Sequence, residues 1–171
     1  EQHPDEEEIT QVIDALTTNY TNFLREEDHF KFMVKQALPS VLGGRRQFRV
    51  WSAAGATGEE PYSIAFYLSE YFPPRDGWDW QILATDISTR ALGGGREAGY
   101  PLERAGAVPR EWLRRYCQRG VGEFEGKFCI KPEVAGRVEF QQLNLLGAFT
   151  FNAPFDLIFC RNVMIYFDRP T

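Results

Sequence analysis

Residues 53–58, with the sequence AAGATG, form a turn of small side chains that is followed directly by two acids, Glu59 and Glu60. Small residues in a turn between a strand and a helix allow a ligand to approach the backbone closely. Phosphate-binding loops place a lysine after such a turn to neutralise the phosphate, and no lysine stands there in this chain. The two carboxylates would repel a phosphate, so the turn is predicted to hold a ligand of another kind.

A third acid, Asp86, ends the next apolar stretch, residues 80–87. Where strands are parallel, ligands bind beyond their carboxyl ends, and dinucleotide folds keep an acid there that accepts hydrogen bonds from ribose hydroxyls. Two other interpretations remain open: Asp86 caps the following helix, and the two glutamates complement the dipole of theirs. An adenosine ligand that carries an ammonium and a sulfonium, but no phosphate, suits all three acids. S-adenosylmethionine (SAM) is such a molecule.

The elements that must position these acids follow from the hydrophobic pattern. Three buried strands are predicted, over residues 48–54, 80–87 and 155–162. Helices are predicted over 59–72, with Pro61 in the first turn, and after Ser88, which is expected to be the N-cap. Strands that alternate with helices predict an α/β fold, a doubly wound, Rossmann-like parallel sheet with flanking helices. Glycines at 93–95 predict that the helix after Ser88 is frayed.

The regions beside this core carry other patterns. Apolar residues recur at helical spacing over 6–20 and 28–42. Residues 1–45 are therefore predicted to be a remnant N-terminal helical segment and linker, and residues 46–171 the ligand-binding domain. Within that domain, residues 109–143 read as a short helix and two short strands separated by turns, which predicts a small antiparallel β insertion.

Composition argues against several classes of function. The net charge of −5 gives no electrostatic case for binding nucleic acid. The 3 cysteines and 2 histidines lack the spacing of a metal site, and no apolar run approaches the roughly 20 residues of a membrane span. No signal-peptide pattern is seen, so a cytoplasmic protein is expected. The sequence stops at Thr171, directly after the third predicted strand, which predicts a truncated domain.

Several separated stretches resemble the CheR-type chemotaxis receptor methyltransferases. They run in family order: WSAAGATGEEPYSIA (51–65), ILATDISTRAL (82–92), LNLL (143–146) and FDLIFCRNVMIYFD (155–168). The connector NYTNFLRE (19–26) resembles the family's Asn-x-Thr-x-Phe-Phe-Arg segment, with Leu24 in place of the second phenylalanine. The resemblance implies transfer of a methyl group from SAM to glutamate side chains of chemoreceptors in sensory adaptation. The cytoplasmic domains of those receptors would be the protein partners.

The resemblance also implies roles for single residues. Tyr166 would lie near the transferred methyl group, and Arg25 would close the site over cofactor and substrate. Cofactor contacts are predicted for Asn19, Thr21, Arg25, Ala53, Glu60, Asp86, Asn144, Leu145, Arg161 and Asn162. Plainer alternatives exist, since Arg25 could pair with its acidic neighbours, Glu26 and Glu27. Asn144 could form a turn, and Tyr166 could be a core aromatic.

Other interpretations of the whole chain stay open. It could bind SAM or its product, S-adenosylhomocysteine (SAH), without turnover, or it could methylate a signalling protein outside chemotaxis. A nucleotide-dependent dehydrogenase is disfavoured by the charges of Glu59 and Glu60. The sequence does not decide which of these two adjacent glutamates contacts the cofactor. The family's N-terminal helical domain and its last strands are expected to be mostly absent. The insertion at 109–143 resembles a subdomain that in some members docks on a receptor tail by β-augmentation, with a structural flap as the alternative.

Overall fold

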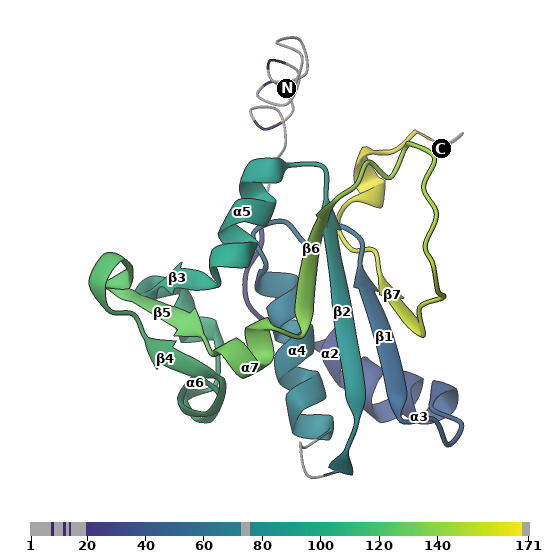
Figure 1. The fold of residues 1–171 in the computed structure, drawn as a ribbon, viewed down its shortest axis with the longest axis horizontal. Coiled ribbons are helices and arrows are strands. Elements are labelled where there is room, and N and C mark those ends of the chain that lie inside the picture. Colours follow the sequence, from purple (N-terminus) through teal and green to yellow (C-terminus); the bar gives the residue numbers. More distant parts are fainter. Residues whose placement is uncertain (1–7, 9–11, 13, 15–19, 73–75, 169–171) are drawn as a thin grey trace.

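The computed structural model describes residues 8, 12, 14, 20–72 and 76–168. A four-stranded parallel sheet in the order β6-β2-β1-β7 forms the centre, and a three-stranded antiparallel sheet, β3-β5-β4, lies to one side (Figure 1). The strands are β1 (Gln47–Ser52), β2 (Asp79–Asp86), β3 (Gly99–Pro101), β4 (Cys117–Arg119), β5 (Lys127–Ile130), β6 (Val138–Gln142) and β7 (Leu157–Phe159). The predicted α/β fold with a parallel sheet is confirmed.

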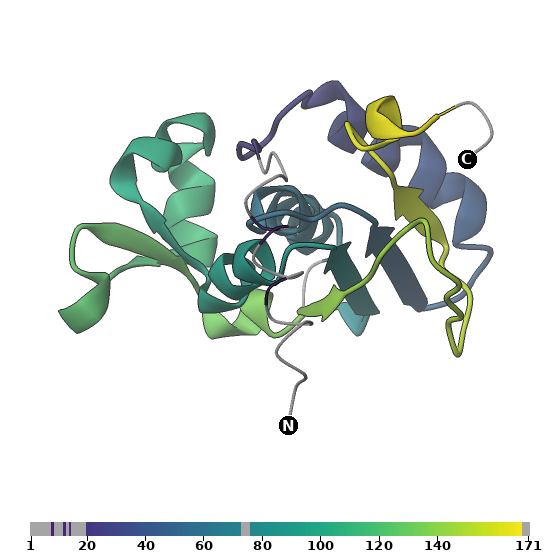
Figure 2. The same ribbon diagram turned by 90° about the horizontal axis from the view of Figure 1, so that it is seen from above.

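Helices cover the parallel sheet, and short helices lie beside the antiparallel one, as the view from above shows (Figure 2). The α-helices are α2 (Asp28–Phe32), α3 (Leu38–Val41), α4 (Glu59–Tyr71), α5 (Thr89–Glu97), α6 (Arg110–Tyr116) and α7 (Pro132–Ala135). Short turns of other helix types are η1 (Met33–Ala37), η3 (Leu102–Ala107), η4 (Gly122–Phe124) and η5 (Met164–Tyr166). No helix in the described part of the chain is long and apolar enough to cross a membrane.

Strands β1 and β2 form the middle of the sheet because alternate side chains are apolar and buried. Phe48 and Val50 of β1 and Ile82 of β2 are at most 1% exposed and belong to the same hydrophobic cluster as the buried face of α4. Val50 lies opposite Ile82 in the parallel register. The opposite face of β1 carries Trp51, whose ring contacts three phenylalanines of the loop before β7: Phe149, Phe151 and Phe155.

The segment before β1 shares this core. Helix α2, the π-helical turn η1 and α3 follow one another over 28–41, which confirms the helix predicted over 28–42. Phe30 is fully buried and stacks on Tyr67 of α4 and on Phe159 of β7, with ring centroids 5.6 and 5.7 Å apart. The predicted domain boundary at residue 45 stays a prediction, and the helix predicted over 6–20 lies mostly outside the described residues.

The predicted small antiparallel sheet is present, but its strands differ in part from those predicted. It begins earlier, at β3, and its strands β3 and β4 both pair with β5. The strand expected near the end of the insertion is β6, which instead pairs parallel with β2, with Val138 opposite Ile82. The prediction was wrong here because the alternation of buried Val138 and Phe140 indicates a half-buried strand without indicating its partner.

Helix α5 begins as predicted, with the Ser88 hydroxyl accepting a hydrogen bond from the Ala91 N–H at 3.1 Å. It is one helix through all three glycines, and the predicted fraying stays a prediction. A Cβ on Gly95 would lie 2.4 Å from the ring of Phe140 in β6, and the Tyr62 hydroxyl donates to the Gly95 carbonyl at 2.9 Å. Gly95 is therefore required by the close packing of α5 on β6.

Candidate functional site

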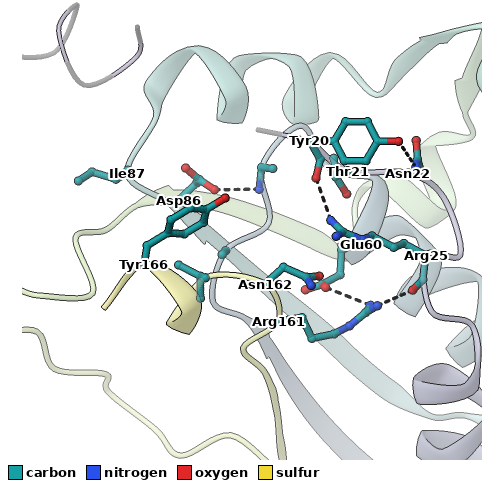
Figure 3. A pocket seen from close by; sticks show the side chains of 13 residues that line it. Tyr20, Thr21, Asn22, Arg25, Glu60, Asp86, Ile87, Arg161, Asn162 and Tyr166 are labelled. Atoms are coloured by element: carbon teal, nitrogen blue, oxygen red, sulfur yellow. Dashed lines mark hydrogen bonds and ion pairs between the residues drawn. The ribbon is translucent and has the colours of Figure 1, made fainter. Parts of the chain in front are cut away.

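A cavity of about 370 Å³ opens at the carboxyl ends of the parallel strands (Figure 3). It lies where the chain order of the sheet reverses, between β1 and β7, which is the position where open α/β sheets bind ligands. The turn after β1, the end of β2, the segment after β7 and the connector before α2 form its walls. The described residues that line it are Tyr20, Thr21, Asn22, Arg25, Ala54, Ala56, Glu60, Asp86, Ile87, Arg161, Asn162, Val163 and Tyr166.

Asp86 ends β2 and holds the small-residue turn in place. Its Oδ2 accepts a hydrogen bond from the Ala56 N–H and its Oδ1 accepts one from the Ser88 N–H, both at 3.0 Å. Ala56 has a φ of 45°, in the left-handed region that costs a residue with a Cβ about 1–2 kcal/mol. The Asp86 carboxylate therefore does two things: it faces the cavity and it also holds Ser88, the N-cap of α5.

The two acids at the start of α4 have different surroundings. Glu59 has no exposed surface, and its carboxylate accepts hydrogen bonds from Arg104 of η3 and from the Thr57 hydroxyl. Glu60 points into the cavity, as Figure 3 shows. The structure therefore separates the two residues that the sequence could not, and Glu60 is the one at the site.

Glu60 is a nearly buried carboxylate, with a side chain that is 11% exposed. Its Oε1 accepts a hydrogen bond from the Ser52 hydroxyl at 2.8 Å, and its Oε2 accepts one from Arg161 Nη1 at 3.2 Å. Burial raises the pKa of Glu60, while the hydrogen bond from Ser52 and the charge of Arg161 lower it. Overall the pKa of Glu60 is raised, which means that the site favours the neutral carboxyl. A bound cation would favour the ionised form.

Arg161 connects the segment after β7 to the connector before α2. Its Nη2 donates to the Arg25 carbonyl and, at 3.2 Å, to Glu26, and its guanidinium lies 5.1 Å from the centroid of the Phe30 ring. The hydrogen bond from Arg161 is the main reason why the pKa of Glu26 is lowered. Since Arg161 also bonds Glu60, one guanidinium joins two walls of the cavity.

Arg25 and two tyrosines stand at the rim. Arg25 Nη1 donates to the Tyr20 carbonyl at 3.0 Å, and its guanidinium lies 5.7 Å from the Tyr20 ring centroid. The ion pair with Glu26 proposed as an alternative is also present, with Arg25 Nε 3.8 Å from a carboxylate oxygen. Tyr166 lines the cavity and is 67% exposed, so it is no core aromatic.

Most predicted site residues come together around the cavity. These are Thr21, Arg25, Glu60, Asp86, Arg161, Asn162 and Tyr166. Three others are not among the described residues that line it. Ala53 is buried, with its N–H bonded to the Phe159 carbonyl at 2.8 Å. The Asn144 side chain accepts a hydrogen bond from the Leu146 N–H at 2.9 Å, so Asn144 forms the turn that was its alternative role. Leu145 lies within this turn. Their cofactor contacts stay predictions, and Asn19 lies outside the described residues.

Four lining residues had no role in the sequence analysis: Tyr20, Asn22, Ile87 and Val163. Each is a chain neighbour of a predicted ligand, so contiguity with Thr21, Asp86 and Asn162 was the available signal. The Asn22 amide donates to the Tyr20 hydroxyl at 3.4 Å, which joins two of the four to one another.

Comparison with known proteins identifies the family. The family model described as "CheR methyltransferase, SAM binding domain" matches residues 19–171. The chain belongs to this family.

Curated relatives of this CheR domain are chemotaxis proteins. The "Chemotaxis protein methyltransferase" of Salmonella typhimurium is 44% identical over 162 residues, which cover 93% of this chain and 54% of the relative. "Chemotaxis protein methyltransferase 2" of Pseudomonas aeruginosa is 43% identical over 176 residues, covering 100% and 60%. The relative from Borreliella burgdorferi is 40% identical over 171 residues, covering 96% and 59%. The chain thus spans little more than half the length of these relatives.

The cavity of the CheR domain fits SAM. Its volume of about 370 Å³ lies within the range of small-molecule pockets. Asp86 and Glu60 offer carboxylate acceptors from β2 and from α4, which suit ribose hydroxyls and an ammonium group. Arg25 and Arg161 line the same cavity and present guanidinium donors that suit a carboxylate. The two acceptors and two donors therefore match the hydroxyl, ammonium and carboxylate groups of SAM.

Proposed function

We propose that the cavity holds SAM with the ribose at Asp86 and the amino-acid end at Glu60. The observation that supports this most strongly is a pair of shielded carboxylates, Asp86 and Glu60, in one cavity whose turn carries no phosphate-binding lysine. Charge-assisted hydrogen bonds to such carboxylates are about twice as strong as neutral ones. Arg25 and Arg161 would then receive the carboxylate of the cofactor.

We further propose that the longer protein methylates glutamate side chains in the cytoplasmic domains of chemoreceptors. Support comes from the names of the relatives, which are chemotaxis protein methyltransferases. When bound, SAM supplies an electrophilic methyl group. A glutamate carboxylate has a reference pKa of about 4.3 and is already ionised at neutral pH, so the chain needs no general base.

The residues of the site would contribute orientation and shielding. Positioning of two reacting groups is worth about 7–11 kcal/mol in favourable cases. Tyr166, at the rim, would orient the incoming carboxylate or the sulfonium, and Arg25 would close the site from the connector side. The reaction removes a positive and a negative charge, so its transition state is favoured when the walls exclude water.

The test is transfer of a labelled methyl group. The longer protein would be incubated with SAM that carries a tritiated methyl group and with membranes that contain a chemoreceptor. Label that alkali releases as methanol identifies a glutamate ester, and the same receptor with its methylated glutamates replaced by alanine is the control. Tyr166→Phe should lower the rate. Firm SAH binding without any alkali-labile label would instead support a non-catalytic binding module.

A further inference from the structure

A buried carboxylate outside the cavity connects the antiparallel sheet to the small-residue turn. Glu59 has no exposed surface, and its Oε1 accepts a hydrogen bond from Arg104, in η3 directly after β3. Its Oε2 accepts a hydrogen bond from the Thr57 hydroxyl, inside the turn. A buried carboxylate without a cation is strongly unfavourable, so the Arg104 guanidinium is the charge that allows Glu59 to stay where it is.

A second contact ties the same turn to the same sheet. The Tyr100 hydroxyl of β3 donates to the Thr57 carbonyl at 2.8 Å. Gly58 follows in the left-handed region, with a φ of 97°, and a Cβ there would lie 2.5 Å from the Tyr100 hydroxyl. Thr57 is therefore held through its side chain by Glu59 and through its main chain by Tyr100.

The other side of the turn forms the cavity wall. Ala56, next to Thr57, lines the cavity with a left-handed φ of 45°, and its N–H bonds Asp86. A residue in such a conformation keeps it only while its surroundings enforce it. One continuous set of contacts thus runs from Arg104 through Glu59, Thr57 and Ala56 to the acid proposed to bind ribose.

We propose that Arg104 is a positioning residue for the cofactor, acting through Glu59 and Thr57 on the conformation of Ala56. The inference rests on the proposed binding of SAM in the cavity. It also means that the position of the antiparallel sheet is transmitted to the turn, because η3 belongs to that part of the fold.

The chain offers a matched control at the other end of α4. Arg115 of α6 binds Glu70 in the last turn of α4, and the Arg115 side chain is 48% exposed, against 45% for Arg104. Both arginines tie the region after β3 to α4 through an ion pair. Of the two ion pairs, the one formed by Arg104 lies next to the turn. Arg115→Met therefore reports how far the loss of an ion pair to α4 lowers SAH affinity in general.

The first experiment is a calorimetric titration of the full chain with SAH, with unfolding temperatures measured in parallel. Arg104→Met should weaken SAH binding by about tenfold or more, the equivalent of one lost hydrogen bond to a charged group, and Arg115→Met by less than about twofold. In the double variant Arg104→Met/Glu59→Gln the buried charge is gone, so the unfolding temperature should recover while the affinity stays low. An affinity that recovers together with the unfolding temperature, or equal losses in the two arginine variants, would overturn the proposal.

A second measurement needs no ligand. Hydrogen exchange at the Ala56 N–H should accelerate about tenfold in Arg104→Met, because its bond to Asp86 depends on the turn, and should not change in Arg115→Met. Unchanged exchange would overturn the positioning role whatever the titration gives. Wild-type chain that binds no SAH would overturn the proposed function, and the exchange result would still decide the role of Arg104 in holding the turn.

Discussion

Replacing Asp86 with asparagine removes the charged acceptor from the cavity with almost no change of shape. Asp86 holds the Ala56 and Ser88 N–H groups at 3.0 Å and is proposed to accept from both ribose hydroxyls. An amide has only one oxygen, and its NH2 group cannot accept a hydrogen bond. Hydrogen bonds to a charged group contribute about 1.5–3 kcal/mol each. A loss of about 2–4 kcal/mol, or roughly 30- to 900-fold in SAH affinity, is therefore expected.

The assay is a calorimetric titration of the folded variant with SAH. Asp79→Asn is the control, since Asp79 lies at the opposite end of β2 and its side chain forms an exposed ion pair with Arg137, at 3.3 Å. That variant should bind SAH as the wild type does. An affinity of Asp86→Asn within about threefold of the wild type would refute the assignment of Asp86 to ribose, because even one lost charged hydrogen bond costs more.

Three further outcomes follow from the structure. SAH affinity should fall on acidification, because burial raises the pKa of Glu60 above its ordinary 4.5 and the ammonium requires the ionised form. The affinity begins to fall as the pH drops through that raised pKa, and it falls at most about tenfold per pH unit. In Glu60→Gln this dependence on pH should be much weaker. Calorimetric titrations with SAH at several pH values check both outcomes. Gly95→Ala should destabilise the fold by about 1–3 kcal/mol, since its Cβ would meet Phe140, whereas Gly93→Ala meets nothing and should stabilise it by about 0.5–1 kcal/mol in urea unfolding. Phe30→Ala should lower the free energy of unfolding by about 3–5 kcal/mol in the same assay, because the Phe30 side chain is fully buried.

The parallel sheet could be predicted because short apolar strand patterns alternate with helical patterns along the chain, and the helix starts because their caps are local. Ser88 is the clearest case, since a hydroxyl three residues before Ala91 needs no tertiary information to cap a helix. Strand partners are a tertiary property. Val138 and Phe140 alternate as they would in either sheet, so β6 was assigned to the wrong one.

Within the site, the residue types were predictable and their orientation was not. Successive residues on a helix point about 100° apart, so Glu59 and Glu60 had to face different ways. Which of them faces the cavity depends on how α4 packs against the sheet, and Arg104 of η3 pairs with the one that is buried. Asn144 is a different case, because the sequence alone does not distinguish an asparagine that forms a turn from one that binds a ligand.

The bond from Arg161 to the Arg25 carbonyl spans 136 residues of chain. On a ribosome that adds about 5–20 residues per second, roughly 7–27 s separate the synthesis of the two ends of this contact. During that interval the connector has left the ribosome and the wall it must meet does not yet exist. A cavity with walls from both segments therefore cannot form until the segment after β7 has been synthesised.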